Sequence, residues 1–165
     1  QKAMIPGLII AIIGGIGGFI ALVGLPFATI SLFFSSESIT AAQIGGWFWY
    51  DFLIVLAAIG VPLLLIYRDT PFGSSFFNSS EKARKGIRWV IGAAISAVLF
   101  EIIFALAAPF FIETNFGSSP QISLGAGYWL YMFTSILIII GGSMALRALP
   151  ATTQVQSSRP NPPTQ

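Results

Sequence analysis

Four apolar segments constrain this chain more than any other feature, because each is long enough, at 1.5 Å per helical residue, to cross about 30 Å of hydrocarbon. They cover residues 7–33, 49–67, 89–112 and 128–146. Backbone in lipid must satisfy its own hydrogen bonds, so these spans are expected to be helices. We predict an all-α integral membrane protein with a single four-helix transmembrane bundle in residues 1–149. A polar, proline-rich cytoplasmic tail follows in residues 150–165.

The basic residues predict the orientation of this bundle. With both ends of the chain in the cytoplasm, every basic residue falls inside, and the outer loops, residues 34–46 and 113–127, contain no Lys or Arg. The eight residues are Lys2, Arg68, Lys82, Arg84, Lys85, Arg88, Arg147 and Arg159. Aromatic residues gather at the predicted outer interface, namely Trp47, Trp49, Tyr50, Tyr128, Trp129 and Tyr131. The predicted location is therefore the cell membrane, crossed four times.

Composition excludes most chemistry within this chain. It contains no cysteine and no histidine, which removes thiolate metal sites, the usual haem ligand and the commonest general base. Only 8% of the residues are charged, whereas soluble domains carry about a quarter. No phosphate-binding loop, nucleophile motif or metal-ligand spacing is present. We expect no catalytic activity, no cofactor, no metal ion and no nucleic-acid partner.

Small residues predict close helix packing. Gly14 and Gly18 form a GxxxG pair in a glycine-rich first span, and such pairs let helices approach closely in lipid. On the third span, a stripe of small residues at helical spacing surrounds one glutamate and lies opposite a branched apolar face. The predicted packing residues are Gly14, Gly18, Ala93, Ala97, Ala105, Gly141 and Gly142. The pattern leaves open whether the contacts lie inside one bundle or between subunits.

Glu101 is the residue that most invites a functional interpretation, because it sits in the middle of the third apolar span. Counting residues from the predicted interfaces places it level with Gly141 and Gly142 of the fourth span and within reach of Ser143. Burial without a counter-charge favours a protonated acid that donates a hydrogen bond to a carbonyl or hydroxyl there. A partner's cation, a cofactor group or a proton path are the alternatives. Asp51 is interpreted as an interfacial charge about 15 Å away along the membrane normal.

A basic cluster precedes the third span. Lys82, Arg84, Lys85 and Arg88 resemble juxtamembrane groups that meet anionic lipid head groups. The plainer interpretation is that these charges serve topology alone.

Two functions remain open at this stage. The first is a small non-catalytic subunit of a larger membrane complex, an energy-converting complex being one example, whose Gly- and Ala-rich faces pack on other membrane subunits. The alternative is a small homo-oligomeric transporter or channel in which Glu101 binds a proton or an ion.

Overall fold

The computed structural model describes residues 2–32, 35–44, 46–116 and 121–149. Most of these residues are helical, and four helices are long and apolar enough to cross a membrane. The four long helices are α1 (Ile5–Gly24), α2 (Gly46–Ile66), α4 (Ser80–Phe116) and α5 (Ala126–Ala148). The short helices are η1 (Lys2–Met4), η2 (Ala41–Ile44) and α3 (Pro71–Phe76). The predicted tail, residues 150–165, lies outside the described residues.

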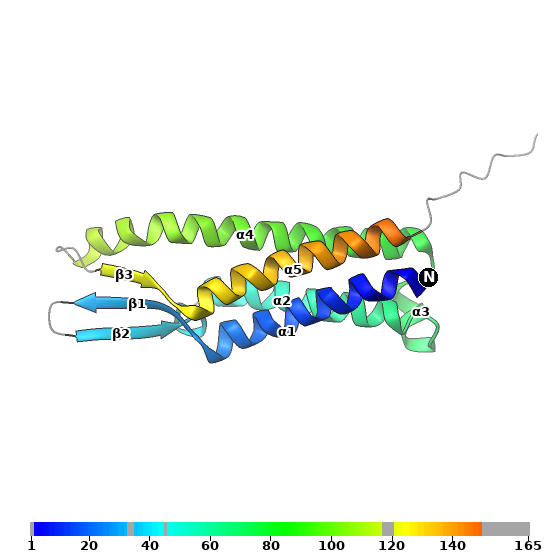
Figure 1. Ribbon diagram of the computed structural model, residues 1–165, viewed down its shortest axis with the longest axis horizontal. Helices are drawn as coiled ribbons and strands as arrows, with labels where there is room; N and C mark the ends of the chain where they lie inside the picture. The colour runs from blue at the N-terminus through cyan, green and yellow to red at the C-terminus, as the bar shows by residue number, and fades with distance from the viewer. Residues whose placement is uncertain (1, 33–34, 45, 117–120, 150–165) are drawn as a thin grey trace, which may run out of the picture.

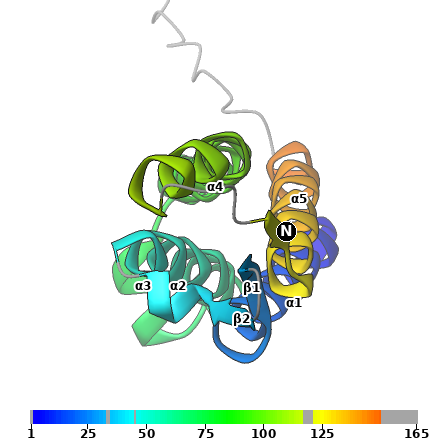
Figure 2. The same ribbon diagram turned by 90° about the vertical axis from the view of Figure 1, so that its left-hand side faces the viewer.

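The long helices run side by side (Figures 1 and 2). Helix α1 packs against α2 and α5, and α4 packs against the same two helices from the other side. The N-terminus and α3 lie at one end of the bundle, which we call the loop end, and the strands lie at the other, which we call the sheet end (Figure 1). The predicted four-helix bundle is therefore present, although the chain is not all-α.

A small antiparallel sheet replaces two predicted loops and the end of the first predicted span. It contains β1 (Pro26–Leu32), β2 (Ser35–Thr40) and β3 (Gln121–Leu124) in the order β2-β1-β3. Ile30 faces Glu37 of β2 and Ile122 of β3. The prediction that the first helix reaches residue 33 is wrong, because Pro26 disfavours a helical conformation at the preceding residue. Leu25 is accordingly extended, with φ −119° and ψ 149°.

Helix α4 is longer than its predicted span at both ends. It has 37 residues, and the Ser79 hydroxyl near its start accepts a hydrogen bond from the Lys82 backbone N–H at 3.3 Å. Its far end passes β3 at the sheet end (Figure 1). The limits of the predicted span therefore do not mark the ends of α4, and counting from them misplaces Glu101 along the bundle.

The glycines of α1 pack within the chain itself. A Cβ atom at Gly7 would lie 2.6 Å from the Gly141 carbonyl oxygen of α5, and one at Gly14 would lie 2.9 Å from the Thr134 carbonyl oxygen. A Cβ atom at Gly18 would meet Val55 of α2 at 3.2 Å. The opposite face of α1 exposes large apolar side chains: Ile5, Ile9, Ile13, Ile16, Phe19, Ile20 and Val23. The small face of α1 thus forms the bundle interior, and its bulky face points outward.

Candidate functional site

Two acidic side chains meet inside the bundle. Asp51 of α2 and Glu101 of α4 are only 3% and 2% exposed, and their carboxyl groups lie within hydrogen-bonding range of each other. Asp51 shares its buried helix face with Ile54, Val55 and Ala58, at the spacing of successive helical turns. Glu101 follows Ala94 and Ala97 on the buried face of α4. Two separate stripes of buried residues therefore bring the acids together.

Helix α5 supplies tyrosines to this carboxyl pair. The Tyr131 hydroxyl lies beside the Asp51 carboxyl group but makes no well-formed hydrogen bond to any described residue. Tyr128 donates a hydrogen bond of 2.6 Å to the backbone carbonyl oxygen of Glu101, which fastens α5 to α4. The Ser135 hydroxyl donates to the Tyr131 carbonyl oxygen at 2.8 Å. The site is thus built by α2, α4 and α5.

Aromatic rings cover the pair on the side of the sheet end. Phe27 of β1 has ring centroids 5.5 Å from Tyr128, 5.9 Å from Phe104 and 6.5 Å from Tyr131, all in edge-on arrangements. Such edge-on contacts are favourable for aromatic rings at these distances. The Gly125 N–H of the α5 N-cap residue donates to the Phe27 carbonyl oxygen at 2.9 Å. We call Phe27, Phe104, Tyr128 and Tyr131 the aromatic cover.

A second set of contacts lies next to the pair toward the loop end. The Tyr50 hydroxyl and the Ser96 hydroxyl are 2.6 Å apart, and Ser96 also donates to the Ala93 carbonyl oxygen at 2.7 Å. The Tyr50 ring contacts Phe100 with centroids 4.7 Å apart. Tyr50 and Phe100 directly precede the two acids in the sequence.

Several expectations about the depth of these residues are wrong. The two acids are in contact, not about 15 Å apart, and Asp51 is a core residue. A Cβ atom at Gly142 would meet Ile91, which lies ten residues before Glu101 and so about 15 Å along the helix, and Ser143 is the next residue of α5. The fourth-span residues level with Glu101 are Tyr128 and Tyr131, which are buried and do not belong to an interfacial belt.

The other predicted residues lie in three places. Ala97 is fully buried with the pair's neighbours, and Ala93 and Ala105 pack against the same cluster. Gly141 lies in the tight contact of α5 with Gly7, while Gly142 packs on α4. The basic cluster Lys82, Arg84, Lys85 and Arg88 occupies the first turns of α4, and Arg84 contacts the Leu149 carbonyl oxygen at 3.5 Å. None of these basic residues reaches the carboxyl pair.

The chemistry available to the pair is proton binding. Asp51 Oδ1, Glu101 Oε2 and the Tyr131 hydroxyl have no hydrogen-bond partner among the described residues, and no described Lys or Arg acts on either acid. Two adjacent carboxylates in a low-dielectric interior repel each other strongly, so a shared proton is the simplest stable state. The described residues contain no group of three or more His, Cys, Asp or Glu side chains suited to a metal ion.

Comparison with known proteins finds no match: no family model, no curated protein and no solved structure is detectably similar to this chain. The functional argument therefore rests on the geometry of the carboxyl pair and its surroundings.

Proposed function

We propose that this chain is a multi-pass membrane protein that moves protons, as a transporter or channel, and that Asp51 and Glu101 form its proton-binding site. The observation that carries the proposal is the buried contact between the two carboxyl groups without a neighbouring cation. Ionisable residues within membrane segments are expensive, and they commonly mark ion or proton pathways.

The protonation state of the pair gives it a means of coupling to conformation. Loss of the shared proton would leave two negative charges in contact within the protein interior, where water does not screen them. The deprotonated pair therefore favours an arrangement in which α2 and α4 move apart or water enters. Binding and release of one proton would thus alternate two arrangements of the same helices.

The surroundings of the pair favour an alternating mechanism. The aromatic cover closes it on one side, and the contacts of Tyr50 with Ser96 and Phe100 adjoin it on the other. In this mechanism the described arrangement is the occluded state, with one proton shared by the pair. Rotation of Phe27 would admit water from the sheet end, and separation of α2 from α4 would admit it from the loop end.

A liposome assay tests this proposal. Purified protein is reconstituted with a pH-sensitive dye inside the vesicles, and a potassium diffusion potential drives protons inward. We expect Glu101→Gln and Asp51→Asn to reduce proton entry at least tenfold, because each amide keeps the size of the acid but removes its ionisable proton. Glu37→Gln is the matched control, since Glu37 is an exposed acid of β2 and should be replaceable without effect.

The proton flux of the wild-type protein and of the two amide variants decides whether the proposal holds. If the wild-type protein folds and gives no proton flux, or if both amide variants conduct as well as wild type, the proposal is wrong.

The hypothesis of a non-catalytic complex subunit stays a prediction, but the glycine faces that suggested it pack within the chain. Mass determination after extraction in mild detergent distinguishes the two: different co-purifying polypeptides favour the subunit, and an assembly of one chain favours transport.

The cell membrane is the proposed location, with the loop end in the cytoplasm. The chain has no cysteine, so single cysteines report topology without background. Ser79 before α4 and Ser38 of β2 are both exposed and lie at opposite ends of the bundle. We expect an impermeant thiol reagent added to sealed cells to label Ser38→Cys only. Labelling of Ser79→Cys from outside contradicts the proposed orientation.

A further inference from the structure

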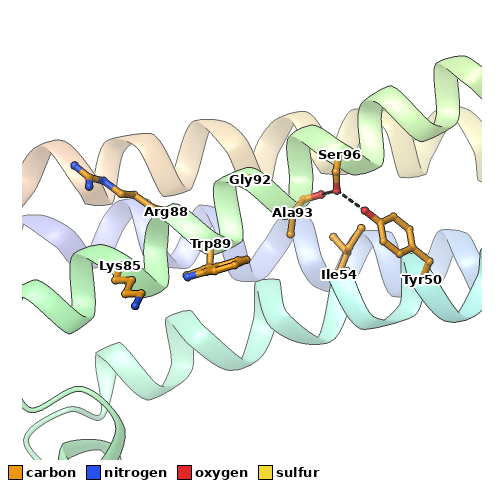
Figure 3. Close-up of a pocket in the computed structure, with 8 residues that line it drawn as sticks. All are labelled: Tyr50, Ile54, Lys85, Arg88, Trp89, Gly92, Ala93 and Ser96. Carbon is orange, nitrogen blue, oxygen red and sulfur yellow. Dashed lines mark hydrogen bonds between the residues drawn. The ribbon is translucent and has the colours of Figure 1, made fainter.

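A groove runs between α2 and α4 on the loop-end side of the carboxyl pair. Its volume is about 530 Å³, within the roughly 300–1,000 Å³ typical of small-molecule sites. Figure 3 shows Tyr50, Ile54 and Ser96 at one end of it and Lys85 and Arg88 at the other. The walls between these ends are apolar, and Gly92 forms part of them. The groove is therefore amphipathic along its length, with two cations at one end only.

The cationic end is placed where a head group is expected. Lys85 and Arg88 are exposed residues in the first turns of α4, and neither forms an ion pair with a described acidic residue. In Figure 3 the Lys85 side chain points toward α2 and the Arg88 side chain points to the other side of α4. Between them in sequence, Trp89 is 71% exposed, as expected for a tryptophan at a membrane interface.

The length of the groove fits one leaflet of a bilayer. From Arg88 to Ser96 the helix rises about 12 Å, and half of a 30 Å hydrocarbon core is about 15 Å. The hydrogen-bonded hydroxyls of Tyr50 and Ser96, 2.6 Å apart, close the far end and leave the Tyr50 ring and Ile54 as apolar lining. A soluble anion would use the cations and leave this apolar length unfilled, whereas an acyl chain would fill it.

We propose that this groove binds one anionic phospholipid, with its phosphate beside Lys85 at the cationic end and one acyl chain lying along Gly92 toward Ile54. Charge complementarity at the mouth selects an anionic head group, since each nearby basic residue favours an anionic surface. The site does not depend on proton transport, but it does require the chain to lie in a bilayer. The proposal gives Lys85, one member of the basic cluster, a role in binding a single lipid.

Gly92 provides a sharp test of the groove. A Cβ atom there meets no protein atom within 4 Å, so Gly92→Leu fills the groove without displacing the chain's own residues. Gly60→Leu on α2 is the matched control, because Gly60 is also open but does not line the groove. For the cation, Lys85→Gln is compared with Arg88→Gln, whose side chain points to the other side of α4, and with Lys82→Gln, which lies outside the groove.

The measurement is native mass spectrometry of protein in mild detergent with equal amounts of phosphatidylglycerol and phosphatidylcholine of the same acyl chains. We expect one phosphatidylglycerol per chain, bound in preference to phosphatidylcholine. Lys85→Gln should weaken its binding about fivefold, and Gly92→Leu should abolish it, while Arg88→Gln, Lys82→Gln and Gly60→Leu bind as wild type. An excess of inorganic phosphate should not displace the lipid.

Three results would overturn the proposal. Equal retention of both lipids shows that the head group is not selected. Loss in Lys85→Gln with unchanged binding in Gly92→Leu shows a surface attraction without an acyl chain bound in the groove. Displacement by inorganic phosphate shows an anion site in place of a lipid site. Thermal unfolding of each variant confirms that lost binding does not reflect a lost fold.

Discussion

Gly141→Leu is expected to prevent stable packing of the bundle. A Cβ atom at Gly141 would lie 2.5 Å from the Gly7 carbonyl oxygen and 2.6 Å from the Ala11 backbone nitrogen, so α1 and α5 must separate to admit any side chain. Inserting atoms into packed interiors typically costs about 1–3 kcal/mol, and we expect the upper part of this range or more because both neighbours are backbone. Close packing is itself the main force between helices in lipid.

Thermal unfolding in detergent measures this effect. Gly60→Leu is the control, because it adds the same side chain to a long helix where a Cβ atom meets nothing within 4 Å. We expect Gly60→Leu to melt like wild type and Gly141→Leu to melt far lower or fail to purify as a discrete species. Equal melting of the two variants would show that the close contact of α1 with α5 is absent.

Phe27→Ala is expected to have the second large effect, on stability and on access to the carboxyl pair. Phe27 is 3% exposed and contacts three rings of α4 and α5. Truncating a buried phenylalanine to alanine typically costs about 3–5 kcal/mol. The resulting cavity would lead from the sheet end toward Asp51 and Glu101, so water and small reagents should reach them.

Chemical labelling detects this opening. A water-soluble carbodiimide with an amine nucleophile should modify Asp51 and Glu101 slowly in wild type and much faster in Phe27→Ala, as read by peptide mass spectrometry. Phe133→Ala is the control, because Phe133 is 59% exposed on α5 and outside the aromatic cover. Unchanged labelling in a folded Phe27→Ala variant would mean that Phe27 does not shield the pair.

The four helices could be predicted from the sequence because a long apolar run has few alternatives. The sheet could not, since β1 continues the apolar run of α1 and only Pro26 marks the change. β2 is short and polar, and β3 has four residues, so neither carries a strong period-two pattern. The pairing of β1 with β3 joins residues about 90 positions apart, which local patterns do not report.

The sequence predicts one member of the carboxyl pair, Glu101, but not its contact with Asp51. Glu101 stood out in its apolar span, and its small-residue stripe indicated burial. The contact of Asp51 with Glu101 is not predictable from span ends, because α4 extends past its predicted span at both ends and the span limits do not give the relative depth of the two acids. One signal was available: Asp51, Ile54, Val55 and Ala58 form one face of α2. In a helix that is apolar all round, however, such spacing does not identify which face is buried.

Helix α5 completes the site although it follows the other described elements along the chain, and this order has a consequence for biogenesis. Synthesis delivers α1, α2 and α4 first, so the two acids and the small face of α1 must wait for the segment that supplies Tyr128, Tyr131 and Gly141. During that interval the acids lack Tyr128 and Tyr131, and α1 lacks the helix with which it makes its tightest contacts. The carboxyl pair therefore reaches its described surroundings only after α5 has been made.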